Sequence, residues 1–314
     1  MNKKLFGFVL SILLLTLCGL TAAAQGPYIY NDIPNTLAGN YPSQPFEAQS
    51  ASEFGDRLAF TGVARKLTTV TVTMSSWGCQ SGHWYSGDCV TPSGATFTHP
   101  ITINVYAVGS GNQPGALLAT KTQAVAIPYR PSADLVNCTG GDTGKWYSAG
   151  ENHCYNGYAA NITIDLSSLG ATLPNQVILG IAYNTSHYGY APIGESAPCY
   201  TSAGGCGYDS LNVALLDPAL SQSAGSNPAP DDAYMNSTYA GAYCDGGAGG
   251  LGTFRLDPGA GCWTGFKPAI AVRAVNPPTS ANDCKNNGWQ TRTTLSGASF
   301  PNQGQCIQYF NTGK

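Results

Sequence analysis

The sharpest cluster of side chains that could bind a ligand lies in the segment 183–190, Tyr-Asn-Thr-Ser-His-Tyr-Gly-Tyr. Its aromatic rings could stack on sugar rings, while its Asn, Ser and His side chains could hydrogen-bond the sugar hydroxyls. We take Tyr183, His187 and Tyr188 as candidate binding residues. The alternative is that this segment ends a buried strand and that its tyrosines cap the core.

Two further aromatic clusters lie in stretches that begin and end with a cysteine, residues 79–89 and residues 138–154. Rigid rings lose little conformational entropy on contact, so exposed rings on closed loops suit ligand binding. The alternative is that each ring folds back over its own disulfide. The candidate binding residues in these stretches are His83, Trp84, Tyr85, Trp146 and Tyr147.

Residues that could catalyse a reaction are few. Glycoside hydrolysis needs paired carboxylates, and Glu53 and Asp56 could form such a pair or bind calcium, although carboxylates so placed more often complete a turn. The nearest approach to a serine-hydrolase motif, around Ser196, lacks the final glycine. HExxH, P-loop and dinucleotide-binding motifs are absent. We therefore assign no catalytic residue, expect no metal and no cofactor, and favour a protein that is not an enzyme.

The first 24 residues have the three parts of a secretory signal. A short positive start is followed by an uncharged apolar run over residues 5–20, and then by Ala22 and Ala24, which fit the small-x-small cleavage rule. The apolar run is shorter than the roughly 20 residues of a membrane span. We expect cleavage after Ala24, a secreted or cell-surface protein, and no transmembrane span in the mature chain.

Export determines how the cysteines are interpreted. The chain has 11 cysteines, and losing Cys18 with the signal leaves an even number in an oxidising compartment. Spacing leaves the connectivity open, but each consecutive pair brackets a Gly/Ser/Asn-rich stretch, which suits loops closed at their bases by disulfides. A tight CxxC pair is absent, which argues against zinc. The cysteines expected to form disulfides are Cys79, Cys89, Cys138, Cys154, Cys199, Cys206, Cys244, Cys262, Cys284 and Cys306.

Composition indicates an extracellular β-protein. Charged residues are only 10% of the chain, against about a quarter in an ordinary soluble protein. The formal net charge is −3 and no basic run is present, so the electrostatic footprint of a nucleic-acid-binding protein is missing.

Period-2 alternation of apolar residues predicts strands over 66–74, 101–108 and 160–166, and more uniformly apolar runs predict central strands over 177–183 and 268–275. No segment of useful length shows helical periodicity. The pattern predicts an all-β protein, a jelly-roll-like β-sandwich with disulfide-stapled loops over residues 25–276. Weaker strand candidates are 58–63, 116–122, 124–128 and 211–215.

The chain ends in a small separate unit. The Pro-rich stretch 277–280 is expected to be a hinge, and residues 281–314 are too short to bury a core unaided. We expect a Cys284–Cys306 disulfide to stabilise this unit. The side chains expected to pack on that disulfide are Trp289, Phe300 and Ile307.

Two parts of the chain resemble known families. The patterns Cys-Lys-x-x-Gly-Trp (284–289), Phe-x-Asn-Gln-Gly-x-Cys (300–306) and Thr-Gly-Lys (312–314) resemble a module that recurs at the ends of bacterial secreted proteins and has no activity attached to it. Through the stretches 32–34, 53–55, 67–77, 114–118 and 183–189, the main body resembles an uncharacterised family of exported bacterial β-sandwich proteins. Its segment 103–115 is similar to a strand and turn of choice-of-anchor surface domains, whose sorting tail this chain lacks.

These observations favour a secreted, non-enzymatic β-sandwich that binds an extracellular glycan or a cell-envelope component through stapled aromatic loops. Two alternatives stay open. The protein could be a structural component of the envelope or matrix, or a polysaccharide hydrolase whose carboxylates, Glu53 and Glu195 among them, are brought together by the fold. The sequence does not determine the oligomeric state.

Overall fold

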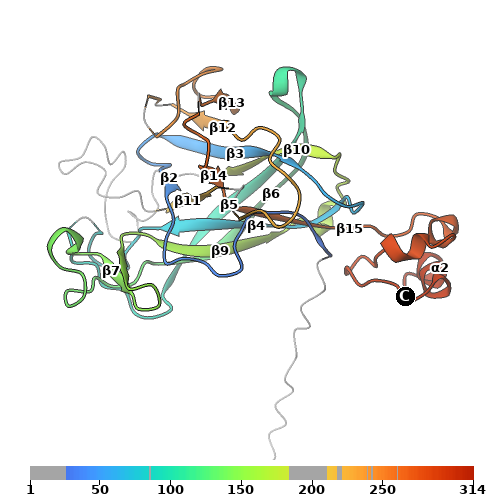
Figure 1. The fold of residues 1–314 in the computed structure, drawn as a ribbon, viewed down its shortest axis with the longest axis horizontal. Coiled ribbons are helices and arrows are strands. Elements are labelled where there is room, and N and C mark those ends of the chain that lie inside the picture. Colours follow the sequence, from blue (N-terminus) through green and yellow to red (C-terminus); the bar gives the residue numbers. More distant parts are fainter. Residues whose placement is uncertain are drawn as a thin grey trace, which may run out of the picture.

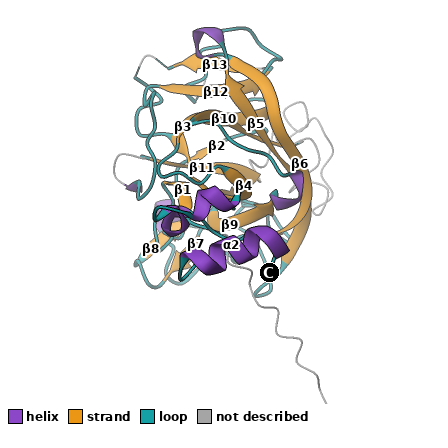
Figure 2. Ribbon diagram, turned by 90° about the vertical axis from the view of Figure 1, so that its right-hand side faces the viewer, coloured by secondary structure: helices purple, strands orange, loops and turns teal. Residues whose placement is uncertain are grey.

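The fold is mostly β, and its two antiparallel sheets lie against each other as a sandwich (Figure 1). The computed structural model describes residues 26–84, 86–183, 211–217, 221–238, 240–241, 243–259 and 261–314. Seen from the end, the second sheet curves around the first, and the one described α-helix lies outside both (Figure 2).

The first sheet has the strand order β1-β15-β4-β11-β14, with β2 paired to β11 and β9 paired to β4. The second sheet has the order β13-β12-β3-β10-β5-β6, and β7 and β8 form a separate hairpin. The bounds are β1 Tyr28–Asn31, β2 Ser43–Gln44, β3 Ala51–Ala59, β4 Lys66–Ser76, β5 Thr96–Val108, β6 Pro114–Pro128, β7 Trp146–Ser148, β8 His153–Tyr155, β9 Tyr158–Asp165, β10 Gln176–Ala182, β11 Leu211–Leu216, β12 Asp232–Ser237, β13 Arg255–Pro258, β14 Lys267–Pro268 and β15 Ile270–Val275.

Alternation along β4 places its apolar side chains in the core, as the sequence predicts. Val70, Val72 and Met74 are fully buried between the sheets, because alternate residues of a strand point to opposite faces. On the outer face, Thr71 hydrogen-bonds Thr163 at 2.8 Å. This confirms both the strand and the direction of its faces.

The other predicted strands are confirmed with three corrections. The predicted central strand 268–275 is divided between β14, which ends at Pro268 at the edge of its sheet, and β15, which begins at Ile270. The stretches 116–122 and 124–128 belong to one strand, β6, and the candidate at 58–63 is wrong because the strand is β3, which ends at Ala59. Glu53, Gly55 and Asp56 interrupt the apolar alternation of β3 and hid it from the pattern. β10 is central in its sheet, between β3 and β5, and its residues 177–181 are buried.

The chain also contains a helix that the sequence analysis missed, α2 (Gln303–Thr312). Asn302 caps its N-terminus by accepting a hydrogen bond from the Gln305 N–H at 2.9 Å, and Gly313 ends it in the left-handed conformation at φ 73°. So short a helix is marginal alone. Its stability comes from tertiary packing. Because few of its residues take part in that packing, the sequence shows little helical periodicity.

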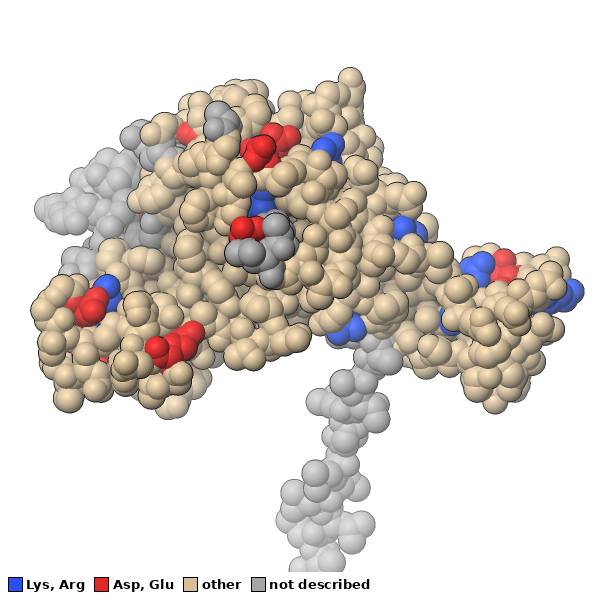
Figure 3. Space-filling view, in the orientation of Figure 1, with Lys and Arg blue, Asp and Glu red and all other residues tan. Residues whose placement is uncertain are grey.

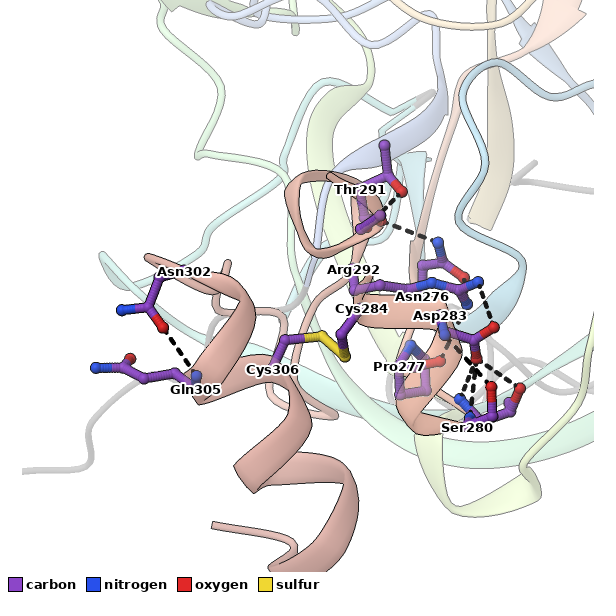
Figure 4. Close-up of a disulfide and its surroundings, with 12 residues drawn as sticks. Asn276, Pro277, Ser280, Asp283, Cys284, Thr291, Arg292, Asn302, Gln305 and Cys306 are labelled. Atoms are coloured by element: carbon purple, nitrogen blue, oxygen red, sulfur yellow. Dashed lines mark hydrogen bonds and ion pairs between the residues drawn. A yellow bond between two sulfur atoms is a disulfide. The ribbon is translucent and has the colours of Figure 1, made fainter. Parts of the chain in front are cut away.

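That packing is centred on the Cys284–Cys306 disulfide, which joins α2 to the short 3₁₀ helix η6 (Ala281–Cys284), as Figure 4 shows. Phe300 is buried beside the disulfide, and Trp289, Ile307 and Tyr309 pack against it. This confirms the core expected for the C-terminal unit. Three further predicted disulfides are present, Cys79–Cys89, Cys138–Cys154 and Cys244–Cys262. Cys199 and Cys206 lie outside the described residues.

Side chains on both sides hold the Pro-rich stretch before this unit. Asp283 Oδ2 accepts hydrogen bonds from the Thr279 and Ser280 N–H groups at 2.7 and 2.9 Å. Arg292 forms an ion pair with Asp283 at 3.3 Å and donates to the Asn276 side chain at 3.1 Å (Figure 4). These contacts connect the end of β15 to the C-terminal unit.

A buried polar network crosses the sandwich. Asp56 on β3 lies 3.7 Å from the ammonium group of Lys267 on β14, and both side chains are buried. Asn227 donates to Asp56 at 2.6 Å, while Asp32 accepts from the Ile270 N–H and from the Tyr30 hydroxyl. Buried charges need such partners, so the network is a structural one.

The network predicts a pH dependence of stability that Asp56→Asn removes. Burial, offset in part by Lys267, raises the pKa of Asp56 from 3.8 to about 7. Between these pH values the folded chain therefore binds more protons than the unfolded chain, and Asp56 makes stability fall as the pH rises from about 4 to about 7. We expect the free energy of unfolding, measured by urea denaturation across this range, to fall more steeply with pH in the wild type than in Asp56→Asn. The prediction would be contradicted if the free energy of unfolding changed with pH at the same slope in the wild type and in Asp56→Asn.

Candidate binding face at the stapled loops

The two disulfide-closed loops that the sequence analysis selected pack against each other. Gly87 and Gly144 meet so closely that a Cβ added to Gly144 would lie 2.6 Å from the Gly87 Cα, and Gly144 has a φ of +88°. Only glycine accepts both constraints. The Ala133 N–H, five residues before the second loop, donates to the Cys89 carbonyl at the end of the first loop at 2.9 Å. The hairpin β7–β8 of this region lies at the left in Figure 1, at the end of the molecule opposite α2.

Trp77 and Trp84 form the first part of a series of rings on these loops. Their ring centroids are 4.7 Å apart with an edge-to-face geometry, which is a favourable arrangement of aromatic rings. The Trp77 Nε1–H donates to Ser75 Oγ at 3.0 Å, and Ser75 donates to Asn40 at 2.7 Å. Gly157 lies directly against Trp77, Ser75 and Asn40, because a Cβ added there would lie 2.5 Å from Trp77 Nε1.

Trp146 forms the second part of the series. It contacts Tyr158 and Tyr155 with ring centroids 5.5 and 5.6 Å away, and Tyr155 in turn lies 4.5 Å from His153. The Trp146 Nε1–H donates to the Gly157 carbonyl at 2.6 Å. Gly157 therefore touches both tryptophans and joins the two parts of the series.

We call this series the aromatic face. Trp146 is 7% exposed and serves as the floor, whereas the other rings are half-buried or exposed, so their edges and faces reach solvent. The face consists of Trp77, Trp84, Trp146, His153, Tyr155 and Tyr158.

Hydrogen-bonding groups border the aromatic face. Glu151 accepts from the Gly39 N–H and from the Ser148 hydroxyl, each at 2.8 Å. Partial burial, and then the charge of Glu151 and a hydrogen bond to it, raise the pKa of Tyr155. The Lys145–Asp142 ion pair at 2.7 Å leaves the loop with little net charge.

The structure places the predicted binding residues in different environments. Trp146 belongs to the face as its buried floor, and His83, Trp84 and Tyr147 are half-buried on the stapled loops. The Tyr147 hydroxyl donates to Asn152 at 2.8 Å. Tyr85, His187 and Tyr188 lie outside the described residues.

Tyr183 lies in the core, as the alternative interpretation of its segment expects. It is 6% exposed, its ring stacks on Phe46 with centroids 4.0 Å apart, and its hydroxyl donates to the Leu211 carbonyl at 2.9 Å. These contacts cover the end of the sandwich after β10. Phe46 occupies the face of the Tyr183 ring on which a sugar would have to stack.

Four members of the face escaped the sequence analysis, namely Trp77, His153, Tyr155 and Tyr158. A signal for them was present, because each lies within a few residues of a cysteine that closes one of the loops. Trp77, Tyr155 and Tyr158 lie just outside the loops, where the loops join the strands, whereas His153 lies inside the 138–154 loop beside Cys154.

Glu53 and Asp56 do not form a carboxylate pair. Residues three apart on a strand point to opposite faces, and Asp56 points into the sandwich toward Lys267. Glu53 lies on the outer face of its sheet, where Asn104 and the Tyr106 hydroxyl donate to it at 2.9 and 3.1 Å. Burial raises the pKa of Glu53. The two groups therefore cannot act together on one substrate, and Glu195 lies outside the described residues.

Across the described ranges, no three His, Cys, Asp or Glu side chains gather where they could hold a metal ion. Among these same residues, no helix has the length and apolar character needed to cross a bilayer. Comparisons with protein-family models, curated proteins and solved structures find no match to this chain. Fold and site together define a disulfide-stapled β-sandwich with an aromatic face at one end.

Proposed function

We propose that the protein is a secreted, non-enzymatic β-sandwich that binds an extracellular glycan through its aromatic face. The four described disulfides are consistent with an oxidising environment. We also propose that the sandwich is jelly-roll-like, which its two antiparallel sheets support. The C-terminal unit lies at the end of the molecule opposite the hairpin β7–β8 (Figure 1).

The observation that carries this proposal is the joining of two separate stapled loops into one series of rings. Glycan-binding surfaces need apolar ring faces for the C–H faces of sugars and neutral polar groups for the hydroxyls. Trp84 and Tyr155 supply accessible ring surface, one in each part of the series. The hydrogen-bonded groups around Asn40 and Glu151 supply polar atoms beside it.

The charge distribution favours a neutral ligand. Lys, Arg, Asp and Glu side chains are sparse over the surface seen in Figure 3, most of which consists of other residues. The side chain of Glu151 is a carboxylate that hydrogen-bonds Tyr155. A strongly anionic polymer would meet no cluster of positive charge here, so a neutral polysaccharide fits better than an acidic one.

A glycan array and a binding screen against cell-envelope polysaccharides test the proposal. Once a ligand is found, we expect Trp84→Ala and Tyr155→Ala each to weaken binding about tenfold or more, because truncating an aromatic anchor costs on the order of 1–2 kcal/mol. Titration calorimetry measures the change. Tyr28→Ala, at an equally aromatic but separate site with 41% exposure, is the matched control and should bind like the wild type.

Two results would overturn the proposal. The first is binding no stronger than background to every glycan and envelope fraction. The second is a glycan whose affinity is the same for the wild type, Trp84→Ala and Tyr155→Ala, since that would place the binding site elsewhere. Release of new reducing ends from a bound polysaccharide would instead support the hydrolase alternative.

A further inference from the structure

A second site lies apart from the aromatic face and shares no residue with it. It is a pocket of about 210 Å³ between β2, β11 and the loops that carry Tyr243 and Phe266. Pro42, Leu215 and Trp263 supply apolar walls. A volume of this size suits one small ring rather than an extended chain or an oligosaccharide.

The walls of this pocket are fixed before any ligand arrives. The Cys244–Cys262 disulfide ties together the two loops that form it. Trp263 is fully buried, and its Nε1–H donates to Asp257 at 2.9 Å. Preorganised walls lower the entropic cost of binding.

Two large rings stay exposed around the pocket. Tyr243 is 57% exposed and Phe266 is 39% exposed, and both line it. Tyr243 and the next residue, Cys244, have φ values of 52° and 73°, a left-handed conformation that non-glycine residues adopt at a cost. The backbone is therefore strained at Tyr243 and Cys244, the two residues that hold the Tyr243 ring beside the pocket.

One residue that lines the pocket has a buried polar atom without a hydrogen-bond partner among the described residues. Gln44 lines the pocket and is fully buried. Its amide nitrogen donates to Gln49, whereas its Oε1 has no hydrogen-bond partner among the described residues. An unsatisfied buried acceptor is costly and rare in native proteins. A donor brought by a ligand would satisfy it.

We propose that this pocket binds a single aromatic ring that carries one hydrogen-bond donor, such as a phenol or an indole. The ring would pack on Trp263 and Leu215 between Tyr243 and Phe266, with its O–H or N–H donating to Gln44 Oε1. A monosaccharide suits the pocket less well, because its several hydroxyls would meet mostly apolar walls and lose hydrogen bonds to water. The same ring could come from a free small molecule or from a Tyr or Trp side chain of a peptide.

The test compares p-cresol with toluene, which has the same ring and methyl group but no donor. By titration followed through tryptophan fluorescence, we expect the wild type to bind p-cresol about tenfold more tightly than toluene, because one buried hydrogen bond contributes about this factor. In Gln44→Met the preference should disappear. Indole should behave like p-cresol. The tripeptide Ala-Tyr-Ala distinguishes the two sources, since binding p-cresol but not the tripeptide assigns a free small molecule.

Variants at the exposed rings keep the proposal testable if Gln44→Met fails to fold. Tyr243→Ala and Phe266→Ala should each weaken p-cresol binding about fivefold or more, as expected when a wall of a small apolar site is removed. Phe310→Ala, on α2 and 41% exposed, is the matched control and should leave p-cresol affinity unchanged. Failure of the wild type to bind p-cresol and indole, or equal affinity for p-cresol and toluene, would overturn the proposal.

Discussion

Replacing Arg255 by methionine is expected to lower the free energy of unfolding by about 3–5 kcal/mol, because it leaves a buried carboxylate without its partner. Arg255 and Asp245 form an ion pair at 2.7 Å, and both side chains are inaccessible to solvent. Arg255 also donates to the Met235 and Ala248 carbonyls, each at 2.7 Å. The substitution therefore removes the group that connects β12, β13 and the glycine-rich loop between them.

Urea denaturation measures this loss of stability. Two further variants test whether it comes from an unpaired buried charge. Adding Asp245→Asn to Arg255→Met should recover part of the stability, since the remaining buried group is then neutral. Arg292→Met breaks the partly exposed pair with Asp283 at 3.3 Å and should cost less than about 1 kcal/mol. Equal losses for Arg255→Met and Arg292→Met would show that burial does not decide the strength of these pairs.

Trp146→Ala is expected to destabilise the protein by about 3–5 kcal/mol, the usual range for removing a large buried aromatic side chain. The ring packs on Tyr155 and Tyr158 and lies against Gly39. Its loss leaves a cavity beneath the aromatic face, so glycan binding should fall along with stability. Thermal unfolding and the glycan titration report the two effects separately.

Trp146→Phe is the informative companion. It keeps an aromatic floor but loses the hydrogen bond to the Gly157 carbonyl, so it should recover part of both stability and binding. If Trp146→Ala unfolded as readily as predicted while glycan affinity in the folded fraction stayed unchanged, Trp146 would support the fold without supporting the face.

Local pattern determined most of the fold. β4 alternates so regularly that Val70, Val72 and Met74 could be placed in the core from sequence alone. β3 could not be placed, because its Gly55 pairs across the sheet with Gly180 and its Asp56 points inward toward Lys267. Both features depend on neighbours that are distant in sequence. The helix α2 was missed for the same reason, since its stability comes from the Cys284–Cys306 disulfide and the packing on it.

The candidate site was predictable in outline. Cysteine spacing identified the two loops but left the disulfide connectivity open, and aromatic residues inside the loops drew attention to Trp84 and Trp146. That the loops meet through Gly87 and Gly144 was not predictable, because a contact between two glycines leaves no pattern in either loop. The pocket beside Gln44 was missed entirely, since its walls come from four separate stretches of the chain.

Hydrogen–deuterium exchange of the full mature chain, with and without a glycan identified by the array, tests the central claim most directly. The aromatic face predicts slower exchange on binding in residues 77–84 and 146–158, with exchange in the C-terminal unit unchanged. Protection confined to other regions, or none in these two segments at saturating glycan, would contradict the assignment of glycan binding to this face.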